Sequence, residues 1–102
     1  MGKLHRMLEP SGYGAIVDNP TQLPKIMSLV QGLGEIPDKK AYQTWNMGTG
    51  MVIATTQPYK VMKLAEQNGI YSQRIGQVVH SDVISINSRG SEKPGEWLNF
   101  FL

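Results

Sequence analysis

The order of apolar and polar residues along the chain predicts four helices. Residues 3–9 place Leu4, Met7 and Leu8 on one helical face, with the i, i+3, i+4 spacing of an amphipathic helix. Three further helices are expected at 23–31, 37–45 and 57–68. Each begins at or near a proline, which the first helical turn accepts because the missing N–H has no partner there. The residues expected to face inward are Ile26, Met27, Leu29, Val30, Leu33, Ala41, Tyr42, Trp45, Val61, Met62, Leu64 and Ala65.

Apolar runs between these helices predict the strands of a sheet. They cover residues 13–17, 50–55, 70–79 and 82–87. The run at 50–55 is almost continuously apolar, so we expect a central strand with both faces buried. Within 70–79, Gly76 is expected to form a bulge. The apolar segment 97–102 is either a last strand or a surface for a partner. These elements predict an α/β (α+β) fold, a mixed β-sheet of about four to six strands with helices packed on it.

Composition and charge narrow the class of protein. With 102 residues, the chain is expected to form a single domain that spans residues 1–102. Its net charge of +2 gives little support to nucleic-acid binding, because such proteins usually carry a dense basic patch. The lack of cysteine excludes disulfides and thiolate catalysis. The sequence shows no signal peptide and no apolar run long enough to cross a bilayer, so we expect a cytoplasmic protein with no membrane partner.

Residue types that usually carry catalysis are few and scattered. His5 and His80 lie far apart in the sequence, and the acidic residues form no adjacent pair. Metal ligation, or a general acid and base, requires such groups to lie close together. We therefore assign no catalytic residue, no metal ligand and no cofactor-binding residue on this chain.

Residues 46–50, Asn-Met-Gly-Thr-Gly, are the best candidate for a site. Glycine allows a backbone to approach a ligand closely, and Asn46 offers both a donor and an acceptor. We expect Gly48 and Gly50 to present N–H groups to a phosphate or a developing oxyanion. Taken alone, the Gly-x-Gly pattern is equally consistent with a tight turn that enters a strand.

The longer stretch Tyr42-Gln-Thr-Trp-Asn-Met-Gly-Thr-Gly-Met-Val52 resembles a known family signature. The signature is Tyr-Arg-Thr-Phe-Asn-Met-Gly-Ile-Gly-Met-Val of aminoimidazole ribonucleotide synthetase, also called phosphoribosylformylglycinamidine cyclo-ligase. The flanks agree, because residues 23–27 and 31–36 are similar to the family's Pro-x-Ile-Phe helix and its following loop. Residues 74–79 resemble its Ile-Gly-x-Val strand. The resemblance covers most of the chain, roughly from Leu4 to Val79, and concerns the C-terminal domain of the family.

This resemblance implies a part in closing the imidazole ring of a purine precursor, with ATP activating an amide oxygen. In the family, an N-terminal half binds ATP and the substrate cleft lies between the two halves. The residues implied to bind the small-molecule purine precursor are Asn46, Met47, Gly48, Thr49 and Gly50. Met47 and Met51 are expected to contribute more to the core than to substrate contact. ATP and Mg²⁺ are implied for the complete enzyme, and neither is expected on this chain alone.

The start of the chain departs from the family pattern. Family members carry a His-Ile-Thr-Gly-Gly-Gly stretch before the first helix of this half, whereas this chain opens Met1-Gly2-Lys3-Leu4. The N-terminal ATP-binding half is also missing. We therefore expect the chain to be inactive alone, and to act with that half in trans or as a homo-oligomer. The alternative is a non-catalytic binding or scaffolding module that retains the fold, and nucleic-acid binding is a third and weaker hypothesis.

Overall fold

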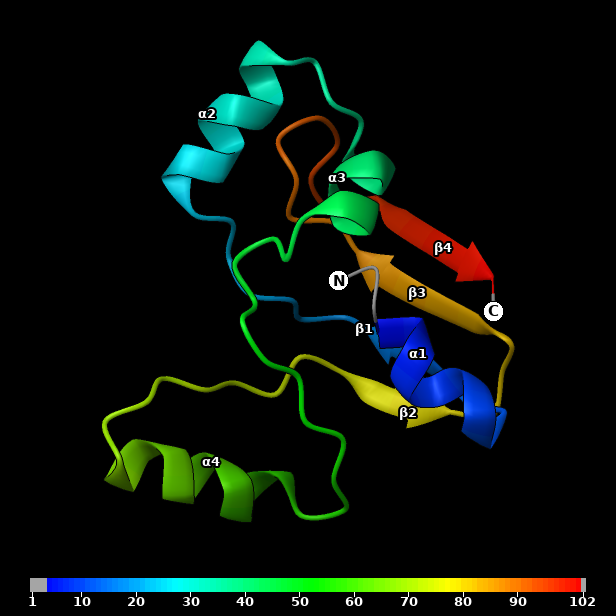
Figure 1. Ribbon diagram of the computed structural model, residues 1–102, viewed down its shortest axis with the longest axis vertical. Coiled ribbons are helices and arrows are strands. Elements are labelled where there is room, and N and C mark those ends of the chain that lie inside the picture. Colours follow the sequence, from blue (N-terminus) through cyan, green and yellow to red (C-terminus); the bar gives the residue numbers. More distant parts are fainter. Residues whose placement is uncertain (1–3, 102) are drawn as a thin grey trace.

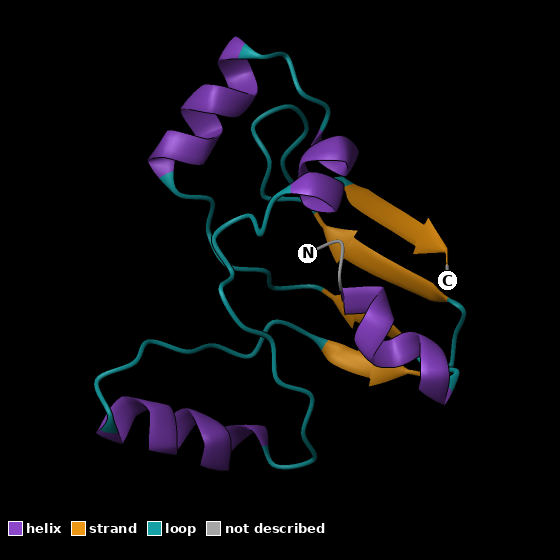
Figure 2. Ribbon diagram, viewed as in Figure 1, coloured by secondary structure: helices purple, strands orange, loops and turns teal. Residues whose placement is uncertain are grey.

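The structure is a computed structural model that describes residues 4–101, and it combines helices with one mixed sheet (Figures 1 and 2). The helices are α1 (Leu4–Leu8), the 3-10 turn η1 (Glu9–Ser11), α2 (Lys25–Leu33), α3 (Asp38–Thr44) and α4 (Pro58–Gln67). The strands are β1 (Gly14–Val17), β2 (Gln77–Val79), β3 (Val83–Asn87) and β4 (Trp97–Phe101). The predicted α+β fold with a mixed sheet is confirmed, with four strands in the described part of the chain.

The four strands lie in the order β2-β1-β3-β4. The central pair, β1 and β3, is parallel, with Ala15 opposite Ile84 and Val17 opposite Ile86. The outer strands β2 and β4 each run antiparallel to their neighbour. The parallel pair at the centre is apolar on one face, as expected for strands covered by helices.

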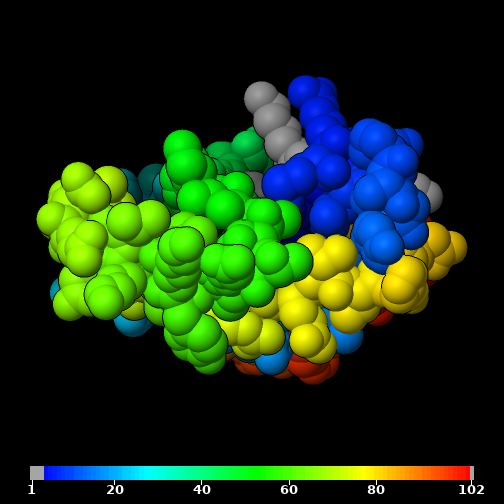
Figure 3. Space-filling model, turned by 90° about the horizontal axis from the view of Figure 1, so that it is seen from below, coloured from blue at the N-terminus to red at the C-terminus, as the bar shows by residue number. Residues whose placement is uncertain are grey.

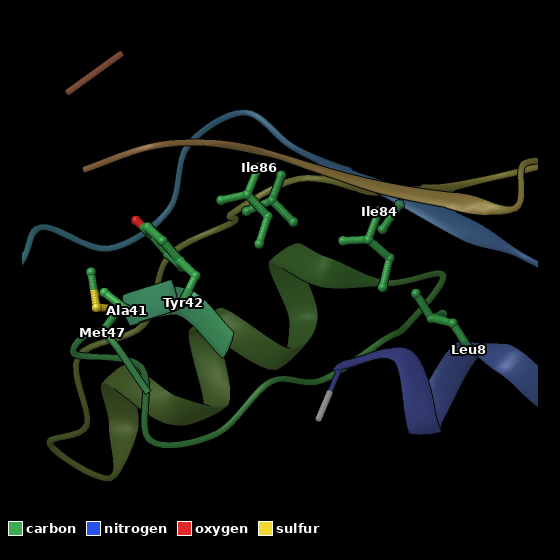
Figure 4. Packing of buried hydrophobic residues seen from close by; sticks show 8 residues of the cluster. Leu8, Ala41, Tyr42, Met47, Ile84 and Ile86 are labelled. Carbon is green, nitrogen blue, oxygen red and sulfur yellow. The ribbon is translucent and has the colours of Figure 1, made fainter. Parts of the chain in front are cut away.

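The core lies between this face of the sheet and two helices. Leu8 from α1 and Ala41 and Tyr42 from α3 point toward Ile84 and Ile86 of β3 (Figure 4). All five side chains are buried. The predicted inward faces of the first and third helices are therefore confirmed at these positions. By contrast, α2 and α4 stand away from the sheet at the ends of long connections (Figure 1).

The strand predicted at 50–55 is wrong. These residues form an irregular segment on the surface, where Met51 is 80% exposed and Ile53 is 57% exposed. An apolar run becomes a buried strand only where a neighbouring strand offers backbone hydrogen bonds. Here the centre of the sheet is taken by β1 and β3, and the run before α4 pairs with neither.

The inward face predicted for the second helix is also wrong. Ile26, Leu29, Val30 and Leu33 of α2 are all exposed, while Gln31 is the buried residue of the helix. The Gln31 side chain donates to the carbonyl oxygen of Ile36 at 2.9 Å. The helix is thus attached by polar contacts on one side, and its apolar stripe faces outward.

The last predicted helix is less buried than expected, and the strand predicted after it is shorter. In α4, Val61, Met62 and Ala65 are half-buried and Leu64 is exposed. Of the strand predicted at 70–79, only β2 forms. The residues before it are held by Asn19 instead, because its backbone N–H donates to Ile75 O at 2.9 Å and its side-chain Nδ2 donates to Arg74 O at 3.1 Å. The final apolar segment does form a strand, β4, and Leu102 lies outside the described residues.

A buried carboxylate anchors the start of α3. Asp38 is 1% exposed and accepts hydrogen bonds from Gln31 Nε2 (2.6 Å), Ser88 Oγ (2.8 Å) and the N–H groups of Glu92 (3.1 Å) and Lys93 (2.9 Å). Burial alone raises the pKa of Asp38, but these four donors outweigh it, and the pKa lies below its usual value. The charged carboxylate therefore joins α2, α3 and the loop after β3, and so positions the helix that leads into the site.

Candidate functional site

The candidate site begins at a tight turn directly after α3. Thr49 N–H donates to Asn46 O at 3.0 Å, which closes a four-residue turn. Its two central residues, Met47 and Gly48, have positive φ angles of 53° and 90°, as in a type I′ turn. Asn46 also uses its side chain, since Asn46 Oδ1 accepts the N–H of Gly48 at 2.9 Å. The asparagine and the glycine of the motif thus build the turn itself.

The turn is held against the core on one side and the segment before α2 on the other. Met47 is 1% exposed and packs with the buried residues of α3 (Figure 4). The hydroxyl groups of Thr21 and Thr49 share a hydrogen bond of 2.7 Å. A Cβ added to Gly48 would lie 2.8 Å from Pro24 Cδ. These contacts leave little freedom for the turn to move.

A pocket of about 450 Å³ opens beside the turn. Its walls come from α1, from the end of α3 and from the loop that follows the turn, which lies next to α1 on the surface (Figure 3). The lining residues are Leu4, Met7, Gln43, Thr44, Trp45, Asn46, Thr49, Gly50, Met51 and Val52. This size is within the usual range for small-molecule sites, and the mixture of apolar walls with a few polar groups is also typical.

The structure brings three of the five predicted site residues into the pocket. Asn46, Thr49 and Gly50 line it, whereas Met47 and Gly48 do not. The expectation that Gly48 offers a free N–H is wrong, because Asn46 Oδ1 already accepts it. Across residues 4–101, the Gly50 N–H makes no hydrogen bond and Gly50 is exposed, so this donor is available to a ligand.

The two methionines of the motif have different surroundings. Met47 packs in the core, as expected, and Met51 does not, because it is 80% exposed and lines the pocket. The difference follows from the missing strand at 50–55, which would have buried Met51. Met51 therefore belongs to the site and not to the core.

Most of the pocket wall lies outside the residues predicted from the sequence. Leu4 and Met7 come from α1, and Gln43, Thr44 and Trp45 come from the last turn of α3 and its end. The three α3 residues directly precede the motif, and this adjacency was a usable signal. The part played by α1 had no such signal, because it depends on how the first helix folds back over the sheet.

The chemistry of the pocket is that of binding and orientation. None of its lining residues carries a charge or titrates near neutral pH. Asn46, Gln43, Thr44 and the Gly50 N–H offer hydrogen bonds, and Trp45 with the aliphatic side chains offers apolar surface. In the part of the chain that the structure describes, no group of three or more His, Asp or Glu could hold a metal ion.

A smaller hollow of about 290 Å³ adjoins this pocket at Gln43. Its lining includes His5, Phe100 and the buried Tyr42. Burial raises the pKa of Tyr42, although Arg89 N–H donates to the Tyr42 hydroxyl at 3.0 Å and partly opposes the shift. Tyr42 therefore stays protonated at neutral pH and ties α3 to the loop after β3.

Among the described helices, none is long and apolar enough to cross a membrane.

Comparison with known proteins places this chain in a family. The family model described as "AIR synthase related protein, C-terminal domain" matches residues 1–88. Several similar proteins are named phosphoribosylformylglycinamidine cyclo-ligase. One from Bacillus cytotoxicus is 35% identical over 85 residues, covering 80% of this chain and 24% of the relative. One from Methanocaldococcus jannaschii is 38% identical over 82 residues, covering 78% of this chain and 23% of the relative.

The chain thus spans about a quarter of the length of the curated relatives it matches. No solved structure matches it significantly. The turn and the pocket described above lie within the matched residues, and β4 lies outside them. Both the family model and the relatives agree with the resemblance of the Tyr42–Val52 stretch. The chain belongs to the family of AIR synthase related proteins, as their C-terminal domain.

Proposed function

We propose that this chain forms one wall of the substrate site of a phosphoribosylformylglycinamidine cyclo-ligase, and that a separate ATP-binding half completes it. The observation that carries the proposal is the position of the pocket. Residues of the stretch that resembles the cyclo-ligase signature line a space large enough for a small molecule. The names of the relatives support this choice of reaction.

The lining of the pocket suggests which part of the substrate it takes. Its donors are the neutral groups of Asn46, Gln43 and the Gly50 N–H, and it holds no Lys or Arg. Such groups suit an amide or amidine better than a phosphate, which is usually held by cations or by several backbone N–H groups. We therefore assign the formylglycinamidine end of the substrate to this pocket, and the phosphate to the ATP-binding half.

ATP and Mg²⁺ belong to the ATP-binding half in this proposal. Mg²⁺ prefers carboxylate oxygens and phosphate, and residues 4–101 contain no group of three or more His, Asp or Glu that could hold a metal ion. The part of this chain is to bind and orient the substrate, and the ATP chemistry comes from elsewhere.

The exposed apolar surface of α2 supports a partner of this kind. Ile26, Leu29 and Leu33 are 65%, 58% and 78% exposed and lie on one helix. Exposed apolar patches of this sort commonly mark interfaces. A non-catalytic binding module remains the second candidate, and it is favoured by the lack of a titratable group in the pocket.

Combining the chain with the N-terminal portion of a relative tests the proposal. The N-terminal portion of the Bacillus cytotoxicus relative, ending before its matched segment, is co-expressed with this chain. ADP release is measured with ATP and phosphoribosylformylglycinamidine. We expect turnover from the co-purified pair and none above background from either part, because neither part holds a complete site.

The full-length relative is the positive control for the assay. Turnover by the isolated chain would contradict the proposal. A pair that co-purifies but stays inactive would also contradict it, and would favour the binding module.

A further inference from the structure

The outer edge of β4 is unpaired and carries no residue that would block pairing with another strand. β4 is the last strand of the sheet, and within residues 4–101 no strand pairs with its outer side. Natural edge strands usually carry a charge, a proline or a bulge that blocks pairing with another chain. The strand Trp-Leu-Asn-Phe-Phe has no charge and no proline. Trp97 and Phe101 are also 48% and 76% exposed, so apolar side chains accompany the open edge.

The hydrogen bonds at the start of β4 show which backbone groups point outward. Gly95, with φ 87°, donates its N–H to Ser88 O at 2.7 Å, and Ser88 N–H donates to Glu96 O at 2.7 Å. This is the pattern of a G1 bulge, and it makes Ser88 and Glu96 a hydrogen-bonded pair. Such pairs alternate along an antiparallel ladder. Leu98 and Phe100 therefore bond to β3.

It follows that Trp97, Asn99 and Phe101 point their N–H and C=O groups away from the sheet. Their side chains lie on the sheet face opposite α1 and α3, because Leu98 and Phe100 pack against the core. Ser85 Oγ donates to Asn99 Oδ1 at 2.7 Å, which also places Asn99 on this face. Asn99 is the middle residue of the strand.

We propose that a second copy of this chain pairs with this edge, β4 against β4 and antiparallel, about a two-fold axis at Asn99. In this register Asn99 lies opposite Asn99 of the second copy, and Trp97 lies opposite Phe101 of the second copy. All three outward residues of each strand then meet outward residues of the other. Each of these pairs can exchange two hydrogen bonds.

The occupant is a second copy because the strand is complementary to itself. The two-fold register places aromatic residues opposite aromatic residues on one face, and Leu98 opposite Phe100 of the second copy on the other. Aromatic cross-strand pairs are favourable, and the strand brings no like charges together. The two sheets would become one continuous sheet of eight strands.

The expected dimer is weak. Two five-residue strands with six aromatic side chains between them are expected to bury less than the roughly 1,200 Å² that stable interfaces need. We therefore expect a micromolar dissociation constant. Because β4 lies outside residues 1–88, which match the family, this contact is independent of the proposed catalytic role.

Proline at position 99 tests the edge without breaking the sheet. The Asn99 N–H points outward, so Asn99→Pro removes a donor at the two-fold axis and leaves the β3–β4 bonds in place. Sedimentation velocity over a range of concentrations is expected to show dimer for the wild-type chain and for the control Asn99→Thr. For Asn99→Pro we expect dimerisation at least ~10-fold weaker, with an unchanged circular dichroism spectrum.

A charge-swap pair tests the register itself. Asn99→Lys and Asn99→Glu each place like charges opposite each other at the axis, so each alone should dimerise several-fold more weakly. An equimolar mixture of the two should restore association. A wild-type chain that stays monomeric up to millimolar concentration would overturn the proposal. So would a dimer that is unaffected by all three charged or proline variants, which would point instead to the apolar face of α2.

Discussion

Replacing Asp38 by alanine is expected to lower the free energy of unfolding by about 3–5 kcal/mol. The change removes a buried carboxylate that accepts four hydrogen bonds, and leaves the Gln31 amide and the Ser88 hydroxyl without that acceptor. It also frees the loop of residues 88–93 from α3. Because small domains are stable by only about 5–15 kcal/mol, urea denaturation followed by circular dichroism should show a large shift of the midpoint.

The matched control is Asp82→Ala. Asp82 is exposed and precedes β3, so its loss should change stability by less than about 0.5 kcal/mol. If Asp38→Ala were as mild as Asp82→Ala, the account of how α3 is anchored would be wrong.

The pH dependence of stability is a separate test of the role of Asp38. The pKa of Asp38 in the folded state is lowered. The carboxylate therefore contributes fully to the free energy of unfolding above the unfolded pKa of about 3.9, and this contribution is lost as the pH falls through the folded pKa. The difference in stability between the wild-type chain and Asp38→Asn should therefore shrink below about pH 4. A difference that stays constant from pH 7 to pH 3 would contradict this reading.

Replacing Gly48 by alanine is expected to cost about 2–4 kcal/mol, because two penalties add. The φ angle of 90° is unfavourable for any residue with a Cβ. The new Cβ would also lie 2.8 Å from Pro24 Cδ and 3.2 Å from Gln22 O. Thermal unfolding measures the loss.

Gly50→Ala is the matched control for this change. Gly50 lies two residues further on, its φ is outside the left-handed region, and a Cβ there would meet no atom within 4 Å. We expect its stability to stay within about 0.5 kcal/mol of wild type. Equal effects at Gly48 and Gly50 would show that the turn is not the rigid corner described above.

The helices could be predicted from the sequence because their signals are local. Proline near the first turn and apolar residues three and four positions apart mark α2, α3 and α4 wherever they lie in the fold. What these helices pack against is not local. The stripe of Ile26, Leu29 and Leu33 was expected to face a sheet, and in the structure it faces outward.

The failed strand at 50–55 has a similar origin. Its apolar residues satisfy the pattern of a buried strand, but a strand also needs a neighbour to pair with, and β1 and β3 occupy the centre of the sheet. The same error explains why Met51 was assigned to the core. Of this run, Gly50, Met51 and Val52 line the pocket, and the run lies on the surface near α4 (Figure 3).

The candidate site could be predicted in part. The motif located the turn, since Gly48 supplies one of the two positive φ angles that a type I′ turn requires. The motif could not reveal that Asn46 Oδ1 accepts the hydrogen bond of the Gly48 N–H, or that Leu4 and Met7 of α1 line the pocket. Both depend on the folded geometry around the turn.

The pocket beside residues 46–52 is proposed to receive the substrate, and Gly50→Leu is designed to block it. A Cβ at this position meets no atom within 4 Å and Gly50 lines the pocket, so we expect leucine to block binding without unfolding the chain. The measurement is the dissociation constant of phosphoribosylformylglycinamidine for the co-purified pair of this chain and the N-terminal portion.

Thr56→Leu, in the exposed segment outside the pocket, is the control. We predict that Gly50→Leu weakens binding at least ~10-fold and that Thr56→Leu leaves it unchanged. Equal affinity in the wild-type and Gly50→Leu pairs would contradict the account.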